Sequence, residues 1–173
     1  MPACDLYDVP VSGTGTENID HNFDGFRATT HVGKNVGSVK MFLYKSGSPS
    51  GLITLYHYRG SSEINSYSPD GNTNWSDLST DSSNPTTVTW NLDDSPEMHS
   101  DSVLCIAGIS AGSNEGRSNS VTASGSHTWV TQYTEDNGAT WITASWSFCG
   151  CITEATVSAG GTLLPPPIAW VNV

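Results

Sequence analysis

Few residues of this chain have the types and spacing that catalysis requires. Residues 108–112 read Gly-Ile-Ser-Ala-Gly and match G-x-S-x-G, the turn that presents a nucleophilic serine, and an apolar stretch precedes them. That turn works only when a helix follows the serine inside a large α/β sheet. Residues 113–119 read Ser-Asn-Glu-Gly-Arg-Ser-Asn, a composition typical of a loop. We therefore interpret the motif as a Gly-Ser loop.

The sequence supports general acid–base catalysis no better than it supports a nucleophilic serine. A glycosidase needs two carboxyl groups roughly 5–10 Å apart across a cleft. Asp93, Asp94 and Glu97 lie together, but they flank Pro96 in a short segment that is typical of a turn. The five histidines show no metal-ligand spacing. We therefore predict that the protein is not an enzyme and has no organic cofactor.

One segment resembles the start of a calcium-binding loop. Residues 70–74 read Asp-Gly-Asn-Thr-Asn, but an EF-hand needs glycine at the sixth position, where this chain has Trp75. An EF-hand is therefore excluded, and two interpretations stay open: a solvated polar loop, or a calcium site of another kind. The oxygen ligands of such a site would come from Asp70, Asn72, Asn74 and Asp77.

Aromatic residues inside polar, turn-rich segments are the side chains best suited to bind a ligand. Sugar rings stack on aromatic side chains, while neighbouring Asp and Asn pair with sugar hydroxyls. The alternative is that these aromatics pack the core. The cluster that we expect to be exposed and to bind glycan consists of Tyr67, Asp70, Asn72, Asn74 and Trp75.

The four cysteines, Cys4, Cys105, Cys149 and Cys151, allow three disulfide pairings. Cys149 and Cys151 are two residues apart on a predicted strand, so their side chains point the same way and are not expected to bond each other. We expect cross-strand disulfides, with Cys105 joined to one of these two and Cys4 to the other. Buried thiols and a zinc cluster are the alternatives.

The elements that must position these residues are strands. The chain contains 17 Gly and 9 Pro, and no segment carries apolar residues at helical spacing, which predicts minimal helix. Val88, Trp90 and Leu92 alternate with polar residues, and the continuously apolar residues 103–107 predict a central strand buried on both faces. We expect an all-β protein, an antiparallel jelly-roll β-sandwich.

Other strands are expected from apolar and aromatic runs between turn signals. Residues 39–44 and 52–58 predict a hairpin closed by the Gly/Pro-containing loop 46–51. The remaining expected strands are 128–133, a long one over 141–152, and a last one at 154–158.

Residues 134–141 predict the tip of another hairpin. They read Thr-Glu-Asp-Asn-Gly-Ala-Thr-Trp, in which the aspartate accepts hydrogen bonds from its own turn and the glycine supplies a positive φ. The pattern resembles the Asp-box of sialidases and of surface-exposed β-domains, where it is a folding device; sialidases carry several copies and this chain has one. The residues of this structural hairpin are Thr134, Asp136, Gly138, Thr140 and Trp141.

Composition and charge exclude several classes of partner. Charged residues make up 13% of the chain, about half the usual share of roughly 25%, and 25 Ser and 19 Thr fill 44 of the 173 positions. The net charge is −11 and the six basic residues do not cluster, so we expect neither nucleic acid nor an anionic membrane surface as a partner. The hydroxyl-rich composition is common in virion and secreted β-proteins, so we expect a virion-surface or extracellular protein. The sequence has no apolar run of ~20 residues and no signal-peptide pattern, and two routes stay open: release by assembly or lysis, or a chain that is already processed.

The order of four segments resembles a jelly-roll domain that recurs in tailed-phage virion proteins and in secreted surface proteins. The segments are 22–31, 37–58 with its Gly-x-Pro-x-Gly-like loop, 88–110, and 126–151 with its Asp-Gly turn and Thr-Trp. The chain departs from the family at Ser145, Ser147 and Cys149, where the closing strand usually carries an Asp and a basic residue. The resemblance implies a binding or packing module.

We therefore expect one domain over residues 1–162 and a proline-rich arm over 163–173, whose Ile168, Trp170 and Val171 dock on this domain or on a neighbouring subunit. The expected function is a non-enzymatic structural protein on the surface of a tailed virus, a capsid decoration or a tail or fibre module. Its partners would be other virion proteins, further copies of itself, with a trimer as our hypothesis, and a cell-surface glycan. The alternative is a carbohydrate-binding or adhesion module of a secreted or cell-surface protein.

Overall fold

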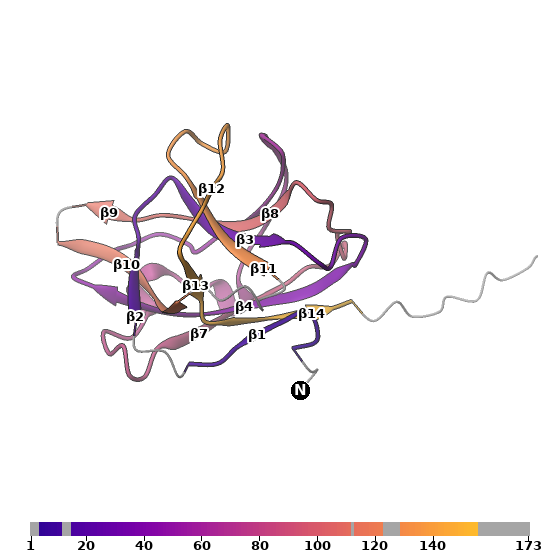
Figure 1. The fold of residues 1–173 in the computed structure, drawn as a ribbon. Coiled ribbons are helices and arrows are strands. Elements are labelled where there is room, and N and C mark those ends of the chain that lie inside the picture. Colours follow the sequence, from indigo (N-terminus) through magenta and orange to yellow (C-terminus); the bar gives the residue numbers. More distant parts are fainter. Residues whose placement is uncertain (1–3, 12–14, 112, 123–128, 156–173) are drawn as a thin grey trace, which may run out of the picture.

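Two antiparallel sheets packed face to face make up the domain (Figure 1). The structure is a computed structural model that describes residues 4–11, 15–111, 113–122 and 129–155. Within these ranges helical structure is limited to two single 3₁₀ turns, η1 (Asp70–Asn72) and η2 (Trp75–Asp77). The predicted all-β antiparallel sandwich with minimal helix is confirmed. No helix in the described part is long and apolar enough to cross a membrane.

The larger sheet, sheet A, runs in the order β1-β14-β4-β10-β13, with β7 on β4 and with β2 and β9 on β10. Its strands are β1 (Tyr7–Val9), β2 (Gly15–Ile19), β4 (Val36–Ser46), β7 (Thr86–Asn91), β9 (Ser110–Ala111), β10 (Asn114–Thr122), β13 (Trp146–Phe148) and β14 (Gly150–Glu154). Sheet B runs in the order β12-β11-β3-β8-β5-β6. Its strands are β3 (Phe23–Ala28), β5 (Leu55–Arg59), β6 (Ser62–Tyr67), β8 (Ser102–Ala107), β11 (Trp129–Thr134) and β12 (Ile142–Thr143).

The main core fills the space between the sheets because alternate residues of each strand point inward. Val88, Trp90 and Leu92 are buried as their alternation predicts, and Trp90 Nε1 donates a hydrogen bond to the Ile53 carbonyl. A second, smaller cluster lies on the outer face of sheet B and includes Cys105. Strand β8 is therefore buried on both faces, as its continuous apolar sequence predicts.

The predicted hairpin between residues 39–44 and 52–58 is wrong. Strand β4 belongs to sheet A, where it pairs with β7, β10 and β14, whereas β5 belongs to sheet B, where it pairs with β6 and β8. The Gly/Pro-containing loop carries the chain from one layer to the other. Two sheets are about 10 Å apart, and the positive φ angles of Gly47 and Gly51 help the loop turn across that space.

The predicted long strand 141–152 is also wrong, because the chain changes sheets within it. Strand β12 pairs with β11 in sheet B, and β13 then pairs with β10 in sheet A. Ala144 N donates to the Thr131 carbonyl at the crossing, and Cys149 N donates to the Asn119 carbonyl before β14 moves on to β4. The strand predicted at 154–158 and the arm 163–173 lie largely or wholly outside the described residues.

Residues 113–119 do not form the loop that their polar composition predicts. They lie mostly in β10, a strand of sheet A that pairs on both edges and buries Ser118, Asn119 and Ser120. A polar strand can be buried here because most of its buried polar groups have partners, although Asn119 Oδ1 has none among the described residues. Ser118 Oγ donates to the Phe42 carbonyl, and Asn119 Nδ2 donates to the Ser82 carbonyl.

Candidate functional site

The two aromatic members of the predicted glycan cluster are buried. Trp75 is 2% exposed and Tyr67 is 8% exposed, and both belong to the main core. The Trp75 ring packs against the backbone of β10, where a Cβ added at Gly116 would lie 2.4 Å from it. The Tyr67 hydroxyl donates to Asp94 Oδ1 at 2.8 Å. The expectation of an exposed aromatic platform is wrong, since the turn η2 directs Trp75 inward.

The polar members of that cluster hold two turns at the rim of the sandwich. Both carboxylate oxygens of Asp70 accept from Asn91 Nδ2, at 2.9 and 2.8 Å. Asn74 and Asp77 form a reciprocal capping box around η2, in which Asn74 N donates to Asp77 Oδ2 at 2.9 Å. Hydrogen bonds from Asn74 lower the pKa of Asp77. Asn72, with a φ of 53°, occupies the left-handed region at the end of η1.

These turns place the calcium ligands considered above in other contacts. Asp70 is committed to Asn91, and Asp77 is committed to the backbone and side chain of Asn74. Across residues 4–11, 15–111, 113–122 and 129–155, no group of three or more His, Cys, Asp or Glu side chains is arranged to hold a metal ion.

The hairpin tip at residues 134–141 is built from its own polar side chains. Thr134 Oγ1 accepts from Gly138 N at 3.1 Å and donates to Asp136 Oδ1 at 2.6 Å, and the same Asp136 oxygen accepts from Thr140 N at 2.8 Å. These contacts lower the pKa of Asp136. Gly138 has a φ of 88°, and a Cβ there would lie 2.7 Å from the Tyr58 ring, so glycine is required on both counts.

Trp141 fastens this tip to the outer face of sheet B. Its Nε1 donates to the Gly60 carbonyl at 3.0 Å, and its ring meets Tyr58 edge to face. The hairpin therefore covers the small cluster that contains Cys105, and its role in this structure is architectural.

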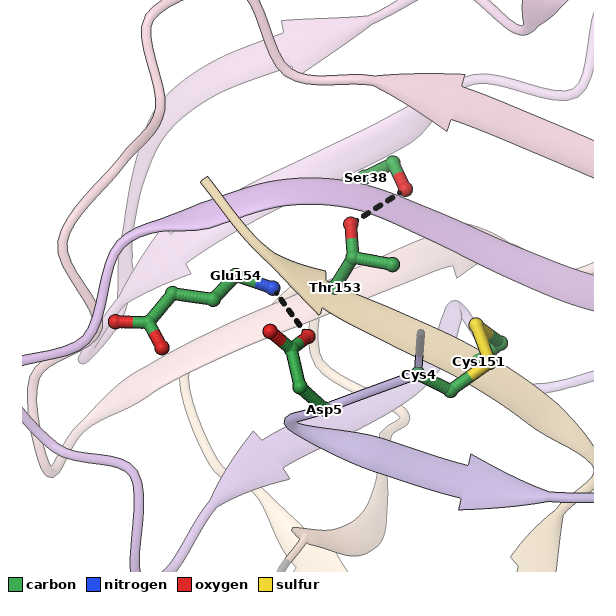
Figure 2. The surroundings of a disulfide bond; sticks show 6 residues. All are labelled: Cys4, Asp5, Ser38, Cys151, Thr153 and Glu154. Atoms are coloured by element: carbon green, nitrogen blue, oxygen red, sulfur yellow. Dashed lines mark hydrogen bonds between the residues drawn. A yellow bond between two sulfur atoms is a disulfide. The ribbon is translucent and has the colours of Figure 1, made fainter. Parts of the chain in front are cut away.

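A disulfide joins Cys4 to Cys151 (Figure 2). It fastens the segment before β1 to the middle of β14, across 147 residues of sequence. Figure 2 shows Asp5 beside it, where its carboxylate accepts a 2.7 Å hydrogen bond from Glu154 N. The other edge of β14 pairs with β4, where the Thr153 and Ser38 hydroxyls share a 2.8 Å hydrogen bond.

The second expected disulfide, between Cys105 and a cysteine of the closing strand, is absent. Cys105 lies in the cluster on the outer face of sheet B, whereas Cys149 lies in the core between the sheets. Both are buried thiols, and the backbone of sheet B separates their positions. Burial raises the pKa of the Cys105 thiol well above its ordinary value.

An open recess on the outer face of sheet B, here called the Arg27 recess, has a volume of about 390 Å³. Strands β3 and β11 provide its floor, and the loop before β8 and strand β12 provide its walls. Arg27 is half-buried, and its Nε donates to the Ser100 carbonyl at 2.8 Å. The lining residues are Arg27, Ala28, Thr29, Val32, Ser100, Val130, Gln132 and Thr143.

A smaller recess of about 200 Å³, here called the His57 recess, lies at the rim near β6. His57 is 4% exposed, and neither ring nitrogen has a hydrogen-bond partner among the described residues. Burial lowers its pKa, so the ring is neutral at pH 7. The other lining residues are Arg59, Ile64, Asp94, Pro96, Glu97 and His99.

A histidine and a buried carboxylate meet at the other end of sheet B. Nδ1 of His21 lies 2.8 Å from Asp24 Oδ1, and the His21 ring stacks on Tyr133 at 3.9 Å between centroids. Asp24 is completely buried, and its Oδ2 has no partner in the described part of the chain. Burial raises the Asp24 pKa to about 6 against the opposing effect of His21.

Comparison with protein-family models, with curated protein sequences and with solved structures finds no match to this chain.

Sequence reasoning missed both recesses. Arg27, Ser100 and Gln132 are about 30 to 105 residues apart in the sequence, and the pairing of β3 with β8 and β11 brings them together. One signal was present in the sequence: Arg27 is one of only six basic residues in a chain with 17 acidic ones.

Proposed function

We propose that this protein is a non-enzymatic structural module on the surface of a tailed-virus particle, either a capsid decoration or a tail or fibre module. In this role one edge of the sandwich is attached to the particle and the opposite rim faces outward. The family resemblance of residues 22–151 and the hydroxyl-rich, weakly charged composition support this assignment.

The observation that carries the proposal is the position of β1 and β14. These strands pair with each other at one edge of sheet A, and the Cys4–Cys151 disulfide fastens the segment before β1 to β14. In Figure 1 they run along the bottom of the view, whereas the hairpin between β11 and β12 rises at the top. If the particle holds the module by this edge, the disulfide keeps the edge strands from being pulled apart. The hairpins at the opposite rim then face outward.

A second edge is suited to packing against another subunit. Strand β6 pairs only with β5 in the described part of sheet B, and its residues 62–66 are exposed, including Ile64 at 56%. An edge strand of this kind presents unpaired backbone groups that can take a further strand. Packing against a shell or a symmetry mate through this edge, with a trimer as the assembly, is part of the proposal.

Mass spectrometry of purified virus particles tests the proposal. We expect peptides of this chain at a fixed ratio to the major capsid or tail protein, and sedimentation of the isolated protein at the mass of a trimer. Absence from particles, together with release of the chain by a cell, would overturn it.

The alternative is a carbohydrate-binding or adhesion module of a secreted or cell-surface protein. The Arg27 recess favours it, because its volume lies in the range of about 300–1,000 Å³ that is typical of small-molecule sites. A glycan array separates the two functions, since binding to no sugar favours a purely architectural role.

A further inference from the structure

The Arg27 recess has an unusual charge for this protein. The chain carries 17 acidic and 6 basic residues, yet among the residues that the structure describes the one ionised side chain lining this recess is an arginine. Among the described residues no carboxylate forms an ion pair with Arg27. Its Nε is fixed by the Ser100 carbonyl, which orients the guanidinium plane. A guanidinium held in this way favours a planar, two-oxygen anion such as a carboxylate.

Gln132 supplies an independent sign of a ligand. This residue is 2% exposed, and its Nε2 donates to Thr143 Oγ1 at 3.2 Å. Its Oε1 is buried and has no hydrogen-bond partner among the described residues, although the side chain lines the recess. Buried acceptors are normally paired, and an unpaired one costs free energy. A ligand hydroxyl that enters the recess could donate to this oxygen after a small movement of the amide.

The remaining lining suits a sugar ring. Val130 and the 48% exposed Val32 offer apolar surface for the C–H face of the ring, and the Thr143 hydroxyl adds a polar group at the rim. Cation, acceptor and apolar surface thus lie around one space of about 390 Å³.

We infer that the Arg27 recess binds a saccharide unit that carries a carboxylate, such as a uronic acid. Arg27 pairs with the carboxylate, Gln132 accepts from a ring hydroxyl, and the two valines contact the ring. This inference deepens the glycan-binding part of the proposed function, and its test does not depend on where the chain occurs.

The His57 recess provides an internal comparison. It also contains an arginine, but Asp94 and Glu97 line it, and Arg59 Nε already lies 3.7 Å from Asp101. The lining carboxylates repel an anionic ligand, and the Arg59 guanidinium already forms an ion pair with Asp101. Arg59 is therefore the matched control for Arg27, as both are accessible arginines in recesses of sheet B.

Titration of the ¹⁵N-labelled full chain, followed by amide NMR signals, tests the inference with glucuronate, glucose and acetate as probes. We expect glucuronate to shift signals of residues 27–32, 100, 130–132 and 143. Glucose, which lacks the carboxylate, and acetate, which lacks the ring, should bind at least about tenfold more weakly at these positions. Arg27→Gln should weaken glucuronate binding about tenfold or more, Arg27→Lys by less, and Arg59→Gln not at all.

Three results would overturn the inference: no glucuronate-dependent shift at these residues, equal binding of glucose and glucuronate, or retention of glucuronate binding by Arg27→Gln. Unchanged far-UV circular dichroism and Tm of the variants establish that any loss is not unfolding. Because particle analysis tests the virion role separately, failure here leaves that role intact.

Discussion

The Asp24 carboxylate is wholly buried, and its Oδ1 lies 2.8 Å from Nδ1 of His21 at the end of sheet B. The pair is held in place by the stacking of His21 on Tyr133 and by the pairing of β3 with β11. Other titratable groups near the carboxylate are Asp20 and the Cys105 thiol. This carboxylate should make stability depend on pH.

Burial raises the Asp24 pKa from 3.8 to about 6 in the folded chain, so the folded state binds this proton more tightly than the unfolded state. The resulting stability is present below pH 4 and is lost as pH rises through 6, by at most ~3 kcal/mol. We expect Asp24→Asn to remove this loss, so that urea unfolding at pH 5 and at pH 7.5 gives a smaller difference than in the parent. The exposed Asp8→Asn is the control, and a parent-like pH dependence of Asp24→Asn would contradict the assignment.

His57 should change the stability of the fold with pH in the opposite direction to Asp24. Its folded pKa is lowered from 6.5 by burial, so the stability that it contributes is present above pH 6.5 and is lost as pH falls below that value. His57→Phe keeps a ring of similar size without unpaired nitrogens. We expect this variant to unfold at a lower pH than the parent in an acid titration followed by tryptophan fluorescence. The half-buried neighbour His99, replaced by Phe, serves for comparison, and an unchanged acid midpoint in His57→Phe would refute the expectation.

The Cys4–Cys151 disulfide should stabilise the domain, because it restricts the unfolded chain across 147 residues. Replacing both cysteines by serine should cost about 2–5 kcal/mol. Reductant should lower the Tm of the parent and leave that of the double variant unchanged. A thiol reagent should react with Cys105 and Cys149 only after unfolding, since both are completely buried. Rapid modification of either in the native protein would contradict their placement.

Thr134 is completely buried beneath the hairpin tip. Thr134→Val preserves its shape but removes the acceptor for the buried Gly138 N–H. We expect a loss of about 1–3 kcal/mol in unfolding free energy, measured in urea. Thr87→Val, an exposed strand substitution on β7, should change stability by no more than about 0.5 kcal/mol. Equal effects of the two substitutions would show that the tip is not held by Thr134.

Trp75 should matter for folding and not for ligand binding. Trp75→Ala leaves a cavity against Gly116 of β10 and should cost about 3–5 kcal/mol. A folded, stable Trp75→Ala protein would contradict the core position of this ring. Ile64→Ala, at an exposed apolar residue of β6, should be near neutral in the same thermal measurement.

The fold class followed from local chemistry. Period-two alternation around Trp90, the apolar run of β8 and the absence of helical periodicity each predict strands, because side-chain direction in a strand depends on adjacent residues alone. The hairpin tip at residues 134–141 could also be predicted from local sequence, because Thr134, Asp136 and Gly138 form hydrogen bonds with one another within a single turn.

The choice of which strands pair with each other did not follow from local sequence. The sequence read β4 and β5 as a hairpin and residues 113–119 as a loop, yet tertiary packing sends β5 to the other sheet and makes β10 a buried strand. The same packing buries Trp75, pairs Cys4 with Cys151 and gathers Arg27 with Gln132. The sequence by itself determined the all-β class, the alternating strand around Trp90, the buried strand β8 and the local turn at residues 134–141. Only the tertiary structure decided which strands pair and which side chains face one another, because those contacts join residues far apart in the chain, and their free energy arises only when two complete layers close on a common core.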